Sequence, residues 1–312
     1  RDAGACPALL DLARERFHAD GLGGSVMITG GALDGIERAL TSHLGPGDTV
    51  AVEDPCWANL KDLLAALGMH AHPIPVDEHG PTVDGLRSAL NAGVGAVIVT
   101  SRAQNPTGAS ISADRAVELR RVLVGATPLV IEDDHWAELA DEPLHPIADA
   151  ADNWLFLRST SKPYGPDLRL ATACGSDHTV ARVVGRMRIG TGWVSTVLQH
   201  IVLGLWEDGS TAPTLRRASA SYRARGDALL SALQQRDVPA TGRMGLNVWV
   251  PVVDEIHAIT TLRDHGYAAN PGHHYRIGTP PAVRLSIGAL PLDHVDRLAD
   301  AVAVAAGQPP RS

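Results

Sequence analysis

Four short polar segments of this chain carry groups that could do chemistry together. Gly30-Gly31-Ala32 leads directly into a predicted helix, and its small residues leave backbone N–H groups free to approach an anion. Asn105 lies in a proline-anchored turn, and the acidic pair Asp133-Asp134 follows a buried apolar run. Ser159-Thr160-Ser161-Lys162 is followed seven residues later by Arg169. The hydroxyl groups and the arginine suit a phosphate, and the lysine suits a Schiff base with an aldehyde.

Each segment also has an ordinary structural interpretation. A glycine turn is common between a strand and a helix, a lone lysine is usually solvated, and acidic pairs often cap helices. Two carboxylates after a buried strand are costly, however, unless one of them meets a cation. An anion cradle, an amide, a buried acid and a lysine together meet the needs of pyridoxal phosphate, with its phosphate, phenolic oxygen, ring nitrogen and aldehyde. The combination therefore predicts a pyridoxal-phosphate site.

The elements that must position these segments are short apolar runs that alternate with amphipathic stretches through the first two thirds of the chain. Most runs are continuously apolar, which is typical of parallel strands covered by helices on both faces. Ligands bind at the carboxyl ends of the strands in such a sheet, and the polar segments follow those ends. Seven runs are expected to be strands: residues 26–29, 49–53, 70–76, 96–101, 129–132, 154–158 and 170–174.

The pattern changes after about Gly175, where mixed helices and antiparallel strands indicate a smaller α+β domain. We therefore expect an α/β fold in two domains, with a large, mostly parallel sheet in residues 1–220 and a small C-terminal α+β domain in residues 221–312. The expected C-terminal elements are a helical region over residues 179–233, strands near 246–251 and 283–287, and helices near 256–265 and 293–305.

The composition limits the class of protein. A net charge of −8, with 45% hydrophobic and 20% charged residues, excludes wholesale disorder and argues against this portion holding nucleic acid by electrostatic attraction. Cys6, Cys56 and Cys174 are far apart and odd in number, which fits a reducing cytoplasm rather than a disulfide framework. The histidines have no metal-ligand spacing, so no metal site is expected.

The longest uncharged run, residues 189–206, has about the length of a membrane span. It contains Gln199, His200 and several small polar residues, so we expect a helix buried inside the protein and no membrane association. The two polar side chains are expected to be satisfied core groups. Trp193 is expected to be a buried core residue, with a position facing the substrate as the alternative.

Six motifs in order along the chain resemble the fold-type I pyridoxal-phosphate-dependent aminotransferases of class I/II. The resemblance extends from about residue 26 to residue 305. The motifs are Glu53-Asp54-Pro55-x-Trp57, Asn105-Pro106-Thr107-Gly108, Asp133, Ser159-x-Ser161-Lys162, Arg169 and Arg284.

The resemblance implies a role for each residue. Lys162 would bind the cofactor aldehyde and move a proton, and Asp133 would pair with the ring nitrogen. Asn105 would hydrogen-bond the phenolic oxygen and lie against the substrate, Trp57 would stack on the ring, and Arg284 would hold the substrate α-carboxylate. The phosphate would be held by Gly31, Ala32, Ser159, Ser161 and Arg169.

The sequence departs from the family pattern in two places. Many members have a tyrosine just after the acid at Asp133, where this chain has His135 and Trp136. His135 can still donate a hydrogen bond to the phenolic oxygen, and we favour it for that role. The partner-subunit tyrosine that reaches the phosphate in the family would lie before Arg1. The resemblance thus implies a homodimer with shared sites and a missing N-terminal segment.

The match is closer still to the aminotransferase-like half of MocR-type regulators in the GntR group, which carry a winged-helix DNA-binding domain upstream. Glu132-Asp133-Asp134, Arg223-x-Arg225 after Tyr222, and a start at Arg1 without Met resemble that subgroup. The favoured function is an aminotransferase that exchanges an amino group between an amino acid and a 2-oxo acid. The alternative is a ligand-sensing domain of a transcriptional regulator, and a third possibility is a degenerate fold without cofactor.

Overall fold

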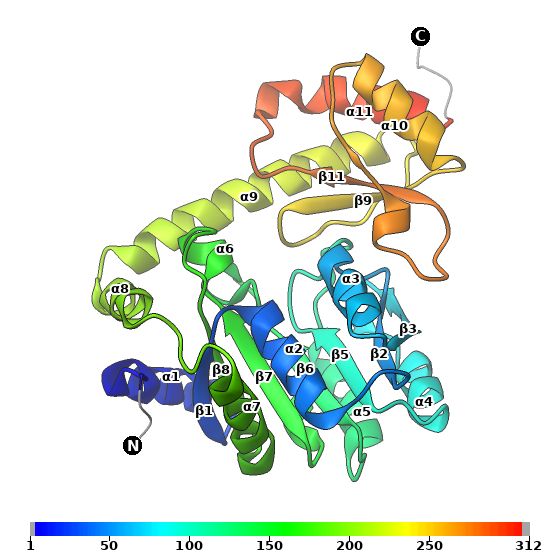
Figure 1. Ribbon diagram of the computed structural model, residues 1–312. Coiled ribbons are helices and arrows are strands. Elements are labelled where there is room, and N and C mark those ends of the chain that lie inside the picture. Colours follow the sequence, from blue (N-terminus) through cyan, green and yellow to red (C-terminus); the bar gives the residue numbers. More distant parts are fainter. Residues whose placement is uncertain (1–3, 308–312) are drawn as a thin grey trace.

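The computed structural model describes residues 4–307, which form a large and a small lobe (Figure 1). The strands are β1 (Ser25–Thr29), β2 (Thr49–Asp54), β3 (His70–Asp77), β4 (Gly80–Pro81), β5 (Ala96–Thr100), β6 (Leu129–Asp133), β7 (Trp154–Ser159), β8 (Ala171–Gly175), β9 (Asn247–Pro251), β10 (Asn270–Pro271) and β11 (Ala282–Ser286). The α-helices are α1 (Pro7–Ala19), α2 (Ala32–His43), α3 (Ala58–Ala66), α4 (Val83–Asn91), α5 (Ala113–Leu123), α6 (Ser161–Tyr164), α7 (Asp177–Ile189), α8 (Thr196–Glu207), α9 (Thr211–Gln234), α10 (Glu255–Asp264) and α11 (Val295–Ala305). Short 3-10 helices are η1 (Ala137–Leu139), η2 (Ala148–Ala150), η3 (Gly272–His274) and η4 (Leu292–His294).

The large lobe is built on an eight-stranded sheet of order β1-β8-β7-β6-β5-β2-β3-β4. Strands β7, β6, β5, β2 and β3 are parallel, as expected, and all seven predicted strands are present. β8 is antiparallel to both β7 and β1, so β1 runs in the same direction as β7. Thr29 and Ser159 both pair with Ala171, which brings the segments after β1 and β7 and the one before β8 to the same edge.

Helices cover both faces of this sheet, which explains why its strands are continuously apolar. In β5, Val97 and Val99 pack on one side with Leu119 of α5, whereas Ile98 packs on the other with Leu40 of α2. Successive side chains of a strand point to opposite faces, so both sets must be apolar where both faces are buried. The carboxyl edge of the sheet is thus left as the place for polar side chains.

The small lobe packs α9, α10 and α11 on a three-stranded sheet of order β10-β11-β9. The helical region expected over residues 179–233 is divided into α7, α8 and α9, and the 24-residue α9 runs from one lobe to the other (Figure 1). Leu215 packs near Trp136 of the large lobe, whereas Leu229 lies in the small-lobe core. We propose that the two domains divide within α9 near residue 220, as the sequence predicts.

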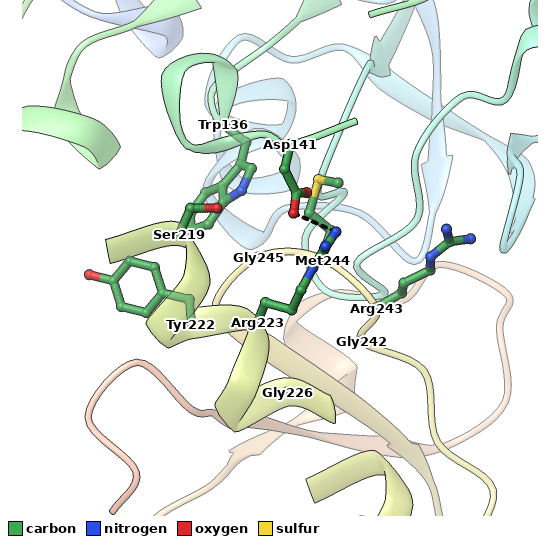
Figure 2. Close-up of a pocket in the computed structure, with 10 residues that line it drawn as sticks. All are labelled: Trp136, Asp141, Ser219, Tyr222, Arg223, Gly226, Gly242, Arg243, Met244 and Gly245. Carbon is green, nitrogen blue, oxygen red and sulfur yellow. Dashed lines mark ion pairs between the residues drawn. The ribbon is translucent and has the colours of Figure 1, made fainter. Parts of the chain in front are cut away.

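A small cavity lies where α9 meets the large lobe (Figure 2). Arg223 points toward Asp141 and forms an ion pair of 2.6 Å, and the rings of Trp136 and Tyr222 lie 5.9 Å apart. The cavity volume of about 10 Å³ is enough for about one water molecule. This junction therefore joins the lobes and has no room for a cofactor.

The uncharged run of residues 189–206 is not the buried helix that we expected. Gln199 is buried as expected, and its amide bonds the Cys6 N–H and the Gly4 and Val194 carbonyls. The predictions for Trp193 and His200 are wrong, because Trp193 is 55% exposed and His200 also lies at the surface. A non-helical segment, residues 190–195, separates α7 from α8, and α8 buries only one of its sides. Among residues 4–307, no helix is long and apolar enough to cross a membrane.

Candidate active site

The turn between β1 and α2 forms an anion-sized corner with Arg169. Gly31 has φ of +116°, and a Cβ at this position would lie 2.7 Å from the Arg169 Nη2 atom. Arg169 Nη1 donates a hydrogen bond to the Ser161 hydroxyl (2.9 Å), and the Ser161 N–H donates to the Ser159 hydroxyl (3.3 Å). α2 begins at Ala32, and the first N–H groups of a helix have no intrahelical acceptors. The structure thus brings all five predicted phosphate residues together.

Asp133 is the last residue of β6, and its side chain is almost fully buried. Its Oδ1 atom is buried without a hydrogen-bond partner, and its Oδ2 atom lies 3.5 Å from Nδ1 of His135. A buried carboxylate oxygen without a donor is costly, so this position is suited to receive an N–H group from a ligand. The Nδ1 atom of His135 faces Asp133. The predicted hydrogen bond from His135 to a phenolic oxygen stays a prediction.

The second acid of the pair has a structural partner. Asp134 is buried, and its carboxylate lies 2.6 Å from Arg102 Nη2 and 3.1 Å from Arg158 Nη2. Burial alone would raise the pKa of Asp134, but the two guanidinium groups hold it below its usual value. The expectation that one acid must meet a cation is therefore confirmed for Asp134, which leaves Asp133 for chemistry.

Lys162 lies in α6, directly after β7, with its side chain exposed at the same edge of the sheet. Partial desolvation by the surrounding protein lowers the pKa of Lys162, and the nearby Arg284 and Arg169 lower it further, whereas Asp133 opposes them. A lysine with a lowered pKa loses its proton more readily, which a nucleophile for an aldehyde requires.

The small lobe contributes Arg284, the third residue of β11. Its Nη1 atom donates a hydrogen bond to Oδ1 of Asn105 (3.2 Å), which also accepts one from Asn247 Nδ2 (3.4 Å). The Nε atom of Arg284 is buried without a partner. A guanidinium fork with free donors is suited to a carboxylate. The predicted Asn105 and Arg284 thus meet across the two lobes.

Sequence reasoning missed two residues of this region, Asn247 and Tyr275. Asn247 pairs with Ser286 in the register of β9 and β11, and the ring of Tyr275 lies 4.7 Å from Cζ of Arg284. Neither residue has a local signal, because each reaches the site only through long-range pairing. Trp57 precedes α3 and packs partly against the large-lobe core, so its predicted stacking on a cofactor ring stays a prediction.

The comparisons with known proteins show the family of this chain. Residues 8–302 match the family aminotransferase class I and II, and the chain belongs to this family. It is 38% identical, over 92% of its length, to the vitamin B6 salvage pathway transcriptional repressor PtsJ of Salmonella typhimurium. It is 29% identical, over 81% of its length, to the pyridoxine biosynthesis transcriptional regulator PdxR of Corynebacterium glutamicum.

The solved structures show the fold. A kynurenine aminotransferase of Pyrococcus horikoshii in complex with PMP superposes with a TM-score of 0.86 at 22% identity, covering 98% of this chain and 81% of that one. The expected fold-type I aminotransferase architecture is thereby confirmed. The chain spans 68% of the Salmonella repressor and 56% of the Corynebacterium regulator.

Proposed function

We propose that this edge of the sheet binds pyridoxal phosphate and exchanges an amino group between an amino acid and a 2-oxo acid. The observation that carries the proposal is the buried Oδ1 atom of Asp133, which lacks a partner at the same edge as Lys162. A protonated pyridine nitrogen is the donor that this oxygen needs. The phosphate corner, which a side chain at Gly31 would fill, supports the same ligand.

In this proposal the start of α2, the two serines and Arg169 would hold the phosphate, and Lys162 would bind the aldehyde. When bound, the cofactor supplies an electron sink that stabilises negative charge at the substrate Cα. Asp133 would keep the ring nitrogen protonated, and Asn105 would orient the phenolic oxygen. The residues named for the phosphate are Gly31, Ala32, Ser159, Ser161 and Arg169.

The chain's own side chains then move the proton and hold the substrate. Lys162 has a lowered pKa, so its Nζ atom can accept a proton from the substrate Cα and return it. Arg284 holds the α-carboxylate through two parallel hydrogen bonds, while Asn105 fixes the position of the guanidinium. Both partners of the reaction carry an α-carboxylate, so one arginine serves the amino acid and the 2-oxo acid.

We further propose that the protein is a cytoplasmic homodimer. Ile189, Trp193, Val197 and Ile201 are large apolar residues with exposed fractions of 77%, 55%, 67% and 44%. A cluster of exposed apolar side chains is characteristic of an interaction surface, and a second copy of this chain would cover it. The three cysteines are free and buried thiols, which supports a reducing compartment.

A titration of the visible absorbance tests the proposed reaction. The protein is loaded with pyridoxal phosphate, then exposed to a panel of amino acids and afterwards to 2-oxo acids. A band that disappears with an amino acid and returns with a 2-oxo acid supports the exchange of an amino group. A band that shifts with amino acids but never cycles would contradict it.

The second candidate function is the ligand-sensing part of a transcriptional regulator. The observation that favours it is the 38% identity to a repressor of which this chain spans 68%. In this case the same residues bind the cofactor and its ligand, and the bound state is passed to a DNA-binding domain elsewhere in the protein. Binding without turnover in the titration, together with ligand-dependent DNA binding by the full-length protein, would support this function.

A further inference from the structure

A segment of the small lobe, residues 272–279, lies against the large lobe, and we call it the strap. The carboxylate of Asp54, at the end of β2, accepts three consecutive backbone N–H groups of the strap. These donors are the amides of Ile277 (2.8 Å), Gly278 (2.8 Å) and Thr279 (2.9 Å). Asp54 is only 6% exposed, so these charge-assisted bonds are shielded from water.

Three more contacts attach the strap to the large lobe. Lys61 Nζ donates to the carbonyls of His273 (3.0 Å) and Arg276 (2.7 Å), and the N–H of Cys56 donates to the carbonyl of Tyr275 (2.8 Å). The side chain of Ile277 packs against the large-lobe core. The strap is thus held by backbone bonds along most of its length.

The side chain of Tyr275 points from the strap into the small lobe. It is 5% exposed and lies edge-on to Trp249, with ring centroids 6.0 Å apart. The Cζ atom of Arg284 lies 4.7 Å from the centre of the Tyr275 ring, within the range of a cation–π interaction. The guanidinium therefore has three contacts: the ring of Tyr275, the amide oxygen of Asn105 and, at 3.5 Å, the hydroxyl of Ser286.

We propose that the strap determines ligand specificity. Tyr275 of the strap positions Arg284, and the hydrogen bonds of the strap to Asp54 and Lys61 fix the position of the strap relative to the large lobe. This inference rests on the proposed function of Arg284 as the carboxylate-binding residue. Lys162 belongs to the large lobe and Arg284 to the small lobe, so the strap fixes the separation of amine and carboxylate that the site accepts. Asp54, Lys61 and Tyr275 are positioning residues for ligands with an α-carboxylate.

The test compares L-alanine with ethylamine, which has the amine but lacks the α-carboxylate. Cofactor-loaded Asp54→Ala, Lys61→Met and Tyr275→Leu proteins are titrated with each probe by visible absorbance. We expect the L-alanine concentration at half-saturation to rise about tenfold, equivalent to the loss of one good interaction. The response to ethylamine and the cofactor affinity stay as in the wild type, and Tyr275→Phe, which keeps the ring, retains the affinity for L-alanine.

Asp48→Ala is the matched control, because Asp48 also accepts a backbone N–H (Gly45, 2.8 Å) but lies at the opposite end of β2. Hydrogen exchange of the amides of residues 277–279 reports the strap directly, and it should be faster in Asp54→Ala and unchanged in the control. Faster exchange with an unchanged ratio of L-alanine to ethylamine affinity would overturn the proposal. An equal loss for both probes would overturn it too, as damage to the whole site.

A readout without substrate separates this proposal from the proposed function. The ¹⁵Nε resonance of Arg284 should shift or broaden in Asp54→Ala and Tyr275→Leu. If the wild type responds to neither probe but this resonance changes, the proposed function fails while the positioning of Arg284 by the strap stands. If the wild type responds and the resonance is unaffected, the proposed function stands and the strap proposal fails.

Discussion

At the scale of residues, Asp133 and Asp134 are adjacent carboxylates with different surroundings. They point to opposite sides of β6, so Asp134 meets Arg102 and Arg158 while Asp133 faces the site. The sequence predicts that one acid must meet a cation, since two buried charges are costly. It cannot predict which cation, because both arginines come from neighbouring strands or loops that only the sheet order brings close.

Removing each carboxylate should therefore have a different effect. Asp134→Ala removes a buried carboxylate from two guanidinium groups, of which Arg158 keeps its ion pair with Asp20 (2.9 Å). We expect the free energy of unfolding to fall by about 3–5 kcal/mol. Asp133→Ala removes Oδ1, which has no partner, and Oδ2, which lies 3.5 Å from Nδ1 of His135, so the stability of the cofactor-free protein should change little. Urea unfolding of both variants measures this difference. Equal losses of stability would show that Asp133 is a structural residue.

At the scale of elements, the turn from β1 to α2 needs Gly31 for two reasons. Its φ of +116° disfavours other residues, and the space for a Cβ is taken by Arg169. The sequence predicts a small residue here but cannot separate an ordinary turn from a ligand cradle. The contact of Gly31 with Arg169 indicates a ligand cradle. This contact exists because β8, which follows Arg169, pairs antiparallel with both β1 and β7.

We expect Gly31→Ala to weaken the binding of pyridoxal phosphate, because the new methyl group displaces the Arg169 guanidinium. Gly47→Ala is the matched control: its φ is +91°, but no atom lies within 4 Å of the position of its Cβ. The control should lose about 1 kcal/mol of stability through backbone strain and keep its cofactor affinity. Fluorescence titration with the cofactor measures both variants. Similar affinities for the two would argue against the cradle.

The end of β2 carries a second buried acid, Glu53, which bonds the N–H (3.1 Å) and hydroxyl (2.9 Å) of Thr100. Burial raises the pKa of Glu53 from 4.5 to about 7. The folded state therefore keeps this proton to a higher pH than the unfolded chain does. The resulting stabilisation is complete below pH 4.5 and is lost as the pH rises to about 7.

Glu53→Gln removes this titration. We expect the free energy of unfolding of the variant to depend less steeply on pH between 4.5 and about 7 than that of the wild type. Thermal or urea unfolding across this range provides the measurement. Burial raises the pKa of Glu132 to about 7 as well, so a smaller slope remains in the variant. A slope as steep as that of the wild type would mean that Glu53 is ionised in the folded protein.

The elements themselves are largely predictable, whereas contacts between distant segments are not. Continuous apolar runs identify all seven predicted strands of the large sheet, because burial on both faces leaves a plain signal. The two-residue β4 and β10 are too short for such a signal, and the strap contacts the large lobe mainly through backbone atoms. Exposure of Trp193 could not be predicted either, because an apolar residue can face the core or a partner.

At the scale of the whole molecule, one group of exposed apolar residues lies around the connection between α7 and α8: Ile189, Trp193, Val197 and Ile201. Val197 and Ile201 are four residues apart, so they share one face of α8. We expect Ile201→Glu to place a charge in the proposed subunit interface and to convert the proposed dimer to a monomer. Sedimentation or light scattering measures the mass, with Ile256→Glu, at an 80% exposed site on α10, as control. A variant that stays dimeric would place the interface elsewhere.

Lys162 is the residue proposed to bind pyridoxal phosphate, and one chemical measurement tests this role directly. The chain has two lysines, Lys61 and Lys162, so the cofactor bond can be fixed with borohydride and located by peptide mass spectrometry. We expect an adduct on Lys162 in the wild type and in Lys61→Met, and none in Lys162→Ala. An adduct that persists in Lys162→Ala, or no adduct in any protein, would contradict it.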